Sequence, residues 1–433
     1  MSLPNTIHWK SLPGPEDIHR FELDNGLVLL HRANFNSPSV VVSGYLPAGA
    51  QFDPPDRLSL ASFTAVSLMR GNERHNHQEL YDLLESSGAS LGYGASVHNV
   101  SFGGRALAED LPMLLGLINE TLRTPTFPPD QLEKLRAQYL TSLAIRAHDT
   151  ADQASLHFDR ILFRDHPYAR PEDGYPHTVR RIQRADLMDF HRRHFGPRGL
   201  VVVIVGAVTA GQALEEVQKA LGDWQNPLQE PIPVMTGVGA LRRTHRKHIT
   251  VPGKVQTDLL IGTLGPQRSS PDFLAASLGN SVLGQFGMMG RIGDVVREQE
   301  GLAYSASTSL NSWIASGSWE VSAGVNPVNL ERTIELMVRE LERFTREPVS
   351  REELEDSQAN YIGRLPLSLE SNGGVAGALL SLERFQLGLD YFQRYPELIK
   401  SITPAQVLEV ARRYIHPDRL AIVSAGPALK PAA

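Results

Sequence analysis

The sequence predicts an α+β fold made of two homologous repeats, each a mostly antiparallel sheet layered with helices. Three observations predict this fold. Two pairs of stretches recur at nearly constant separation, strand-like runs and amphipathic helices do not follow a strict βαβα order, and a proline- and glycine-rich segment lies mid-chain. The 433 residues exceed one average domain, which agrees with two repeats.

The clearest repeat is an amphipathic helix followed by an apolar strand. Residues 182–208 (IQRADLMDFHRRHFGPRGLVVVIVGAV) correspond to residues 402–426 (ITPAQVLEVARRYIHPDRLAIVSAG). Both contain an Arg-Arg pair near the predicted helix end, a proline-containing turn and a run of β-branched residues. The run from Leu200 to Val208 is too short for a membrane helix and, bounded by glycines, indicates a buried strand.

A second pair of helices recurs upstream in each half. Residues 124–145 correspond to residues 346–367, with a proline-containing entry, an acidic first turn and leucines at matching places, Leu132 and Leu354. We therefore expect a first repeat over 1–223, a linker over 224–240 and a second repeat over 241–433. The linker, WQNPLQEPIPVMTGVGA, has the composition of an extended and exposed segment.

Composition and charge exclude several classes of function. The net charge of −6 gives no electrostatic footprint for nucleic acid or an anionic membrane. The chain has no cysteine, which excludes disulfides, thiol catalysis and thiolate metal ligands. No secretory signal pattern is visible at the N-terminus, so the sequence predicts a soluble, cytoplasmic protein.

Several short segments of the sequence resemble the insulinase/pitrilysin zinc peptidases, including the mitochondrial processing peptidase type. In the first half they are FELDNGLVLL, the segment from Leu46 to Ala50, Pro125-Thr126-Phe127, and His166-Pro167-Tyr168 before Gly174. In the second half the resemblance depends on Gly-Leu-Ala-Tyr at 301–304. The resemblance covers nearly the whole chain and implies the two-repeat fold of that family.

The zinc motif of that family is missing. Its pattern H-x-x-E-H places two histidines on one helix face with a glutamate as general base. Aligned on residues 59–71, the histidine positions are Ser62 and Val66 and the base position is Ala65. The family's third ligand, a glutamate, would fall near Ser142, and no acid occurs between Glu133 and Asp149. We therefore expect no zinc or other cofactor in this chain.

The second half keeps the block Arg297-Glu298-Gln299-Glu300-Gly301-Leu302-Ala303-Tyr304. The resemblance implies that Arg297 grips the substrate and that Tyr304 donates its hydroxyl to the developing oxyanion. A phenol donor and a planar guanidinium suit these two roles. The alternative is that Arg297 pairs with a nearby acid and that Tyr304 fills a half-buried strand.

A glycine-rich stretch precedes this block, with Gly284, Gly287 and Gly290 as candidate substrate-binding residues. It lacks the G-K-[ST] and G-x-G-x-x-G patterns of nucleotide loops. A loop that lets a peptide approach the backbone fits it better. A purely structural loop stays equally open.

Three histidine pairs give alternative metal candidates: His75 and His77, His191 and His194, and His245 and His248. None has the i, i+4 spacing of the zinc motif. The positions of His191 and His194 in the second repeat are Ala411 and Tyr414, so the repeat does not require histidine there. We interpret them as complements of a helix dipole, and the other two pairs as solvated surface.

These features predict the non-zinc-binding subunit of a heterodimeric metallopeptidase, inactive alone. Arg297 and Tyr304 would act on a peptide cleaved at the zinc of a homologous partner subunit. The alternative is a non-enzymatic structural or peptide-binding subunit, such as the core subunits of the respiratory chain that resemble this family. The sequence leaves open whether the isolated chain forms homodimers.

Overall fold

The valine-rich run becomes strand β6 (Val201–Gly206), which is buried along its whole length. In the computed structural model, which describes residues 12–287 and 290–429, β6 lies inside a six-stranded sheet of order β1-β2-β6-β3-β5-β4. It runs parallel to β2 and antiparallel to β3. The other strands are β1 (His19–Glu22), β2 (Val28–Ala33), β3 (Ser39–Leu46), β4 (Ser90–Ala95) and β5 (Val100–Leu107).

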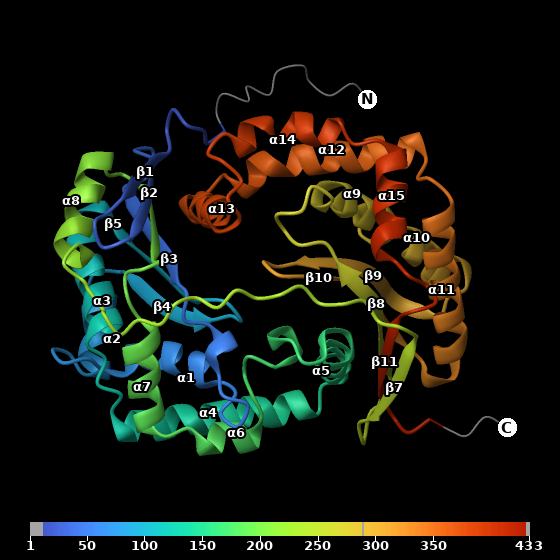
Figure 1. Ribbon diagram of the computed structural model, residues 1–433, viewed down its shortest axis with the longest axis horizontal. Helices are drawn as coiled ribbons and strands as arrows, with labels where there is room; N and C mark the ends of the chain where they lie inside the picture. Colours follow the sequence, from blue (N-terminus) through green and yellow to red (C-terminus); the bar gives the residue numbers. More distant parts are fainter. Residues whose placement is uncertain (1–11, 288–289, 430–433) are drawn as a thin grey trace. The chain divides into compact units, whose positions relative to one another are not determined.

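A second sheet has the order β7-β11-β8-β10-β9 (Figure 1). Its strands are β7 (His245–Thr250), β8 (Thr257–Gly265), β9 (Ala303–Ser312), β10 (Gly317–Val325) and β11 (Ala421–Gly426). Strand β11 is parallel to β7 and antiparallel to β8, as β6 is to β2 and β3. Both sheets are mostly antiparallel, which confirms the predicted α+β class.

The helices and short helical turns form the layers beside the sheets. The α-helices are α1 (Leu60–Ser67), α2 (His77–Ser86), α3 (Leu111–Arg123), α4 (Pro129–Ala147), α5 (Thr150–Phe163), α6 (Pro176–Arg181), α7 (Arg184–His194), α8 (Ala210–Leu221), α9 (Phe273–Gly284), α10 (Gly290–Gly293), α11 (Leu330–Arg346), α12 (Arg351–Ser368), α13 (Asn372–Phe385), α14 (Tyr391–Lys400) and α15 (Pro404–Tyr414). The short turns are η2 (Ala50–Phe52), η3 (Leu68–Arg70), η4 (Ala108–Asp110), η5 (Pro167–Ala169), the π-helical η6 (Asp294–Gln299) and η7 (Pro327–Asn329).

The repeated stretches occupy equivalent elements. Helix α7 and strand β6 correspond to α15 and β11, and α4 corresponds to α12. Thr403 caps α15 with a reciprocal bond to Gln406, and Asp186 closes the same turn at the start of α7. Strand β1, paired antiparallel with β2, has no counterpart beside β7 in the described chain.

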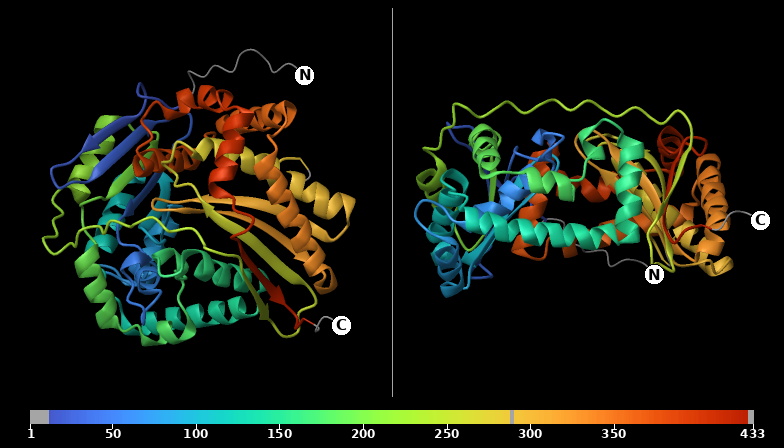
Figure 2. Two further views of the ribbon diagram at one scale, coloured as in Figure 1. Left: turned by 45° about the vertical axis from the view of Figure 1, so that its right-hand side comes forward. Right: turned by 90° about the horizontal axis from the view of Figure 1, so that it is seen from below.

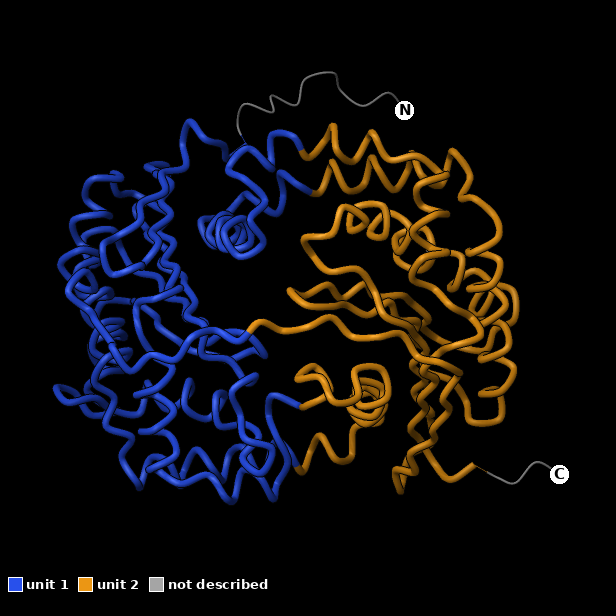
Figure 3. Tube along the Cα trace, viewed as in Figure 1, with its two compact units in different colours: residues 1–143, 171–233, 365–394 blue, residues 144–170, 234–364, 395–433 orange. Residues whose placement is uncertain are grey.

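The chain divides into two compact units (Figure 3). Unit 1 comprises residues 12–143, 171–233 and 365–394, and unit 2 comprises residues 144–170, 234–287, 290–364 and 395–429. Helix α5 therefore belongs to unit 2 although it precedes the linker, and α13 belongs to unit 1 although it follows the linker. The repeat boundaries at 223 and 241 remain a prediction about the sequence.

Helix α13 covers one face of the first sheet, opposite α3 and α8 (Figure 1). Arg20 of β1 forms two hydrogen bonds to the Glu383 carboxylate, at 3.0 and 2.9 Å. The Arg384 guanidinium lies 4.5 Å from the ring centre of Tyr45 on β3. In unit 2, α5 packs on β8 and β11 in the same way, and Thr150 donates a hydrogen bond to Asp258 of β8.

The segment between α8 and β7 has no helix or strand and can be followed in Figure 2. The expectation that all of it is exposed is wrong for its first part. Trp224 and Gln229 are buried, and Gln229 donates to the carbonyl of Arg198 at 2.9 Å. Val234, by contrast, is 93% exposed. In the described part of the chain, no helix is long and apolar enough to cross a membrane.

Candidate functional site

The positions that align with the zinc motif lie on helix α1. Ser62 and Ala65 are buried and Val66 is half-buried. The Ser62 hydroxyl donates to the carbonyl of Glu172 at 3.0 Å. The Glu172 carboxylate itself accepts the N–H of Val97 at 2.8 Å, and burial raises its pKa. The Glu172 carboxylate is therefore engaged by the backbone.

Ser142, at the position of the family's third ligand, is an exposed residue of α4. Helix α4 packs on α1 through Tyr139 and Phe63, whose rings meet edge to face at 5.4 Å. The four aligned positions offer two hydroxyls and two aliphatic groups, whereas zinc takes thiolate, imidazole or carboxylate ligands. No group of three metal-ligating side chains occurs in the described ranges. The residues present do not fit zinc.

Arg297 belongs to the π-helical turn η6, which directly follows α10. Such wide turns are rare in proteins and are often found at functional sites. The carbonyl of Arg297 accepts the N–H of Gly301 at 3.1 Å, and Val296 accepts that of Leu302 at 2.9 Å. The Arg297 side chain is 31% exposed, and its guanidinium lies 3.3 Å from the Glu298 carboxylate. The predicted pairing with a nearby acid is therefore present, without burying the arginine.

Tyr304 lies on β9, the edge strand of the second sheet, at a β-bulge. Ala303 pairs with Val325 and Ala306 pairs with Ala323, so Tyr304 and Ser305 both lie opposite one residue, Gly324. A bulge breaks the alternation of side chains and changes their direction. Tyr304 and Ser305 are accordingly both exposed, Tyr304 at 92%. The alternative of a half-buried strand residue is wrong for Tyr304.

Backbone conformation and close packing explain why some positions of the glycine-rich stretch before Arg297 are glycine. Gly290 has φ +62°, and a Cβ there would lie 2.5 Å from the Val282 carbonyl oxygen. A Cβ on Gly284 would lie 2.8 Å from the backbone N of Thr308 on β9. Gly287 has φ +65° but open space around it. Packing thus explains the glycines at 284 and 290, whereas the open space at Gly287 leaves room for a bound ligand.

An arginine that sequence reasoning missed holds this loop in place. Arg291 of α10 donates two hydrogen bonds of 2.7 Å to the Glu353 carboxylate of α12. These bonds lower the pKa of Glu353 to about 2. Arg291 also lies 3.9 Å from Glu340 of α11, whose pKa is raised by burial. The role of Arg291 is visible only from its contacts among α10, α11 and α12, because no sequence motif marks it.

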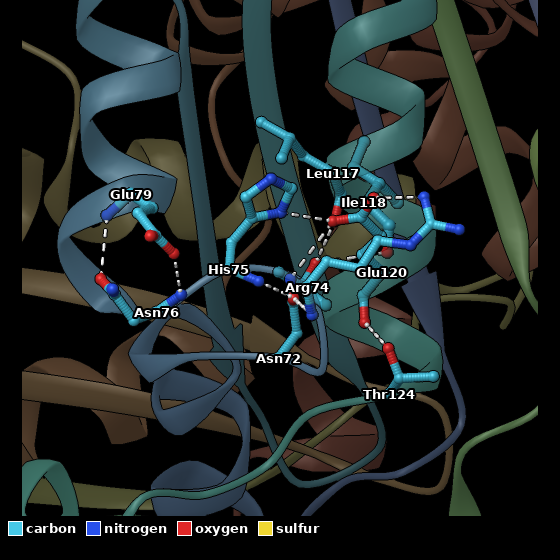
Figure 4. A network of polar contacts seen from close by, with 10 residues as sticks. Asn72, Arg74, His75, Asn76, Glu79, Leu117, Ile118, Glu120 and Thr124 are labelled. Carbon is cyan, nitrogen blue, oxygen red and sulfur yellow. Dashed lines mark hydrogen bonds and ion pairs between the residues drawn. The ribbon is translucent and has the colours of Figure 1, made fainter.

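The histidines near α2 join a polar network instead of a metal site (Figure 4). The Nδ1 atom of His75 lies 2.9 Å from Glu120 of α3, and Arg74 donates to the same carboxylate at 3.2 Å. The backbone N–H of His75 donates to Asn72. His77 contacts the carbonyl of Met69 through Nδ1 at 2.8 Å. These bonds tie the turn before α2 to α3, which corrects the interpretation as merely solvated surface.

His194 is buried and His191 is half-buried, and the interpretation of His194 as a complement of a helix dipole is wrong because burial disfavours its charged form. Burial lowers the pKa of both and brings that of His194 to about 4. His191 contacts the carbonyl of Leu122 at 2.8 Å, and His194 stacks on Phe52 at 4.1 Å between ring centres. His248 on β7 contacts Ser424 and the carbonyl of Pro427.

Comparison with known proteins agrees with this geometry. Residues 181–361 match the family model described as "Peptidase M16 inactive domain". The chain is 24% identical over 372 residues to an uncharacterized zinc protease of Mycobacterium tuberculosis, which covers 86% of this chain and 84% of the relative. It is also 24% identical over 269 residues to human cytochrome b-c1 complex subunit 1, covering 61% of this chain and 55% of that one.

Solved structures share the fold. The crystal structure of a peptidase M16 inactive domain from Pseudomonas fluorescens superposes with a TM-score of 0.88 at 25% identity, covering 96% of this chain and all of that chain. A protease from Helicobacter pylori superposes equally well at 18% identity, which shows the fold alone. This protein is therefore similar to the insulinase/pitrilysin peptidases, the M16 family, and residues 181–361 match the M16 domain described as inactive.

Proposed function

We propose that this chain is the non-zinc-binding subunit of a heterodimeric M16-type peptidase, supplying Arg297 and Tyr304 to peptides cleaved at the zinc of a homologous partner subunit. The observation that carries the proposal is the exposure of the Tyr304 phenol, 92%, on a bulged edge strand. A large aromatic side chain placed in water gains nothing from burial, so packing does not account for it.

The two side chains perform different tasks in this proposal. The Tyr304 hydroxyl donates a hydrogen bond to the oxygen on which charge develops as the peptide bond is attacked. Arg297 holds the peptide backbone or a carboxylate through its planar set of N–H donors. Gly287 lets the peptide backbone approach, because the space around its Cα is open. The activated water would come from zinc held by the partner subunit.

A second candidate is a non-enzymatic structural or peptide-binding subunit. The similarity to cytochrome b-c1 complex subunit 1 favours it. The neighbouring reading frame distinguishes the two. A chain of similar length with H-x-x-E-H, but without the Arg/Tyr block, supports the divided active site.

The test begins with co-purification of the chain and its partner from the native cell, followed by a peptidase assay. The isolated chain should hold no stoichiometric zinc and show no activity, and the complex should have both. In the complex, Tyr304→Phe keeps the ring and removes the donor, so kcat should fall about 100- to 1,000-fold. Tyr81→Phe, at an exposed tyrosine of α2, is the matched control and should leave kcat unchanged.

Arg297→Lys keeps the charge and loses the planar donor geometry, so it should mainly raise KM. Arg339→Lys, at an exposed arginine of α11, is its control. Both site variants should still assemble with the partner. If the complex is active and both variants stay within about twofold of wild type, the Arg/Tyr assignment is wrong. A complex with neither zinc nor activity would support the structural subunit.

A further inference from the structure

Strand β7 leaves one edge of the second sheet open. It pairs with β11 on one side, and within the described residues no strand pairs with its other side. The equivalent strand of the first sheet, β2, carries β1 there in antiparallel register, with His19 opposite His31 and Glu22 opposite Val28. This position of the repeat therefore accepts an antiparallel strand in one sheet and is open in the other.

The open edge presents defined backbone groups. The N–H groups of His245 and Val251 donate toward the β11 side, to the carbonyls of Leu420 and Gly426, at 2.8 and 2.7 Å. In a parallel pair, successive residues direct their N–H and C=O groups to alternate sides. Arg246, His248 and Thr250 consequently direct theirs to the open edge. A strand added at this edge can therefore form main-chain hydrogen bonds with the N–H and C=O groups of these residues.

The charged side chains of β7 and of the residues beside it are all basic. Residues 241–257 contain no Asp or Glu and five basic residues, in a chain whose net charge is −6. These cations are Arg242, Arg243, Arg246, Lys247 and Lys254.

Two of the five cations have side-chain partners from the neighbouring helices. Arg246 pairs with Glu331 of α11 at 2.7 Å, and Lys247 contacts His157 of α5 at 3.0 Å. The pKa of His157 is lowered to about 4, chiefly by burial, so His157 is neutral at neutral pH and the charge of Lys247 stays uncompensated by it. Arg242 and Arg243 are exposed directly before the strand. The edge keeps an excess of positive charge.

We propose that β7 binds an extended acidic segment of a partner protein, which adds to the second sheet as an antiparallel strand. Main-chain pairing would supply affinity and the basic residues would select glutamate- or aspartate-rich sequences. The backbone ladder favours a peptide over nucleic acid or lipid, which have no such donors and acceptors to pair with it. Charged edges also protect sheets from aggregation, and that simpler role makes a different prediction in the test below.

The probe is a fluorescein-labelled peptide of roughly nine residues, the length of a strand, in which glutamate alternates with threonine. Its binding to the full chain is measured by fluorescence anisotropy. We expect binding that weakens with salt. A version N-methylated at alternate residues keeps the charge and loses the donors of one edge, so it should bind at least about tenfold more weakly. A version with lysine for glutamate should not bind.

Variants of the chain locate the site. Arg242→Glu with Arg243→Glu should weaken binding of the acidic peptide at least about tenfold. The same exchange at the exposed neighbours Arg180 and Arg181 on α6 changes the net charge equally and should have no effect. Thr250→Pro removes one outward N–H from an edge where proline is tolerated. It should weaken binding while thermal stability stays close to wild type.

Three outcomes would overturn the proposal. Equal binding of the N-methylated peptide would mean that the backbone edge is not used. Equal or tighter binding of a single-stranded RNA oligonucleotide or of anionic vesicles would assign the surface to another class of partner. Absence of peptide binding up to about 1 mM would mean that the charges serve only to keep the edge from aggregating.

Discussion

Arg291 pairs with the Glu353 carboxylate and lies beside Glu340, which also contacts Arg343 at 3.4 Å. The Arg291 side chain is 12% exposed, and its guanidinium bonds Glu353 twice at 2.7 Å and lies 3.9 Å from the buried Glu340. Arg291→Met keeps the length of the side chain and removes the charge. We expect the free energy of unfolding to fall by about 2–3 kcal/mol, because Glu353 loses its paired guanidinium and the buried Glu340 keeps only Arg343. Urea unfolding at neutral pH measures it.

The ion pair of Arg291 and Glu353 predicts that the free energy of unfolding depends on pH. The folded-state pKa of Glu353 is about 2, below the value of about 4.3 expected in the unfolded chain. The stabilisation is therefore present above the unfolded pKa and is lost as pH falls toward 2. Wild type should lose more stability than Arg291→Met between these pH values. Parallel stability curves for the two proteins would contradict the assignment.

Gly287 and Gly290 offer a matched test of the glycine-rich loop. Both have positive φ, so alanine at either costs about 1–2 kcal/mol of backbone strain. Only at Gly290 would the new Cβ also meet backbone, 2.5 Å from the Val282 carbonyl oxygen. Gly290→Ala should therefore destabilise the protein by about 1–3 kcal/mol more than Gly287→Ala. Equal melting temperatures of the two variants would show that the loop relaxes around the added methyl.

Secondary structure and its order along the chain follow largely from local patterns. The buried run of β6 and the capped helices α7 and α15 are determined by nearby residues, so sequence reasoning predicts them. The bulge at Tyr304 is different, since the register of β9 depends on β10. Alternation within β9 alone would give Tyr304 and Ser305 opposite faces. The exposure of both could be learned only from the paired strand.

The linker has two parts that differ in their exposure to solvent and therefore to proteases. Its first part is fixed by the buried Trp224 and Gln229, whereas Val234 is almost fully exposed. Thermolysin, which cleaves before aliphatic residues, should therefore cut first at residues 231–236, because exposed backbone without regular structure is cleaved before packed segments. Mass spectrometry of the first fragments locates the cut. First cleavage at 225–230 would show that the contacts of Gln229 do not hold in solution.

At the scale of the molecule, the two units do not coincide with the two predicted repeats. The apolar faces of α5 and α13 are a matter of local helical periodicity, but periodicity cannot say which sheet such a face covers. Each helix joins the sheet of the other half of the chain. The replacement of the zinc ligands at Ser62, Ala65, Val66 and Ser142, in contrast, is read residue by residue from the aligned motif.

This exchange predicts how fragments behave. Residues 1–223 alone leave the face of β3 and β6 without α13, and residues 241–433 alone leave β8 and β11 without α5. Each fragment expressed alone should bind a hydrophobic dye and unfold without a sharp transition. Co-expressed fragments should co-purify and regain cooperative unfolding. Two separately stable fragments would instead favour repeats that fold independently.

The exchanged helices also set the order in which the protein can mature on the ribosome. Unit 1 begins near the N-terminus but needs α13, which ends at Phe385, and unit 2 needs β11, which ends at Gly426. Domains usually fold as they emerge during synthesis. Here the first sheet must wait, with an apolar face uncovered, until most of the chain has been translated. Because these contacts are so distant along the chain, we expect folding to be slow and to benefit from chaperones during synthesis.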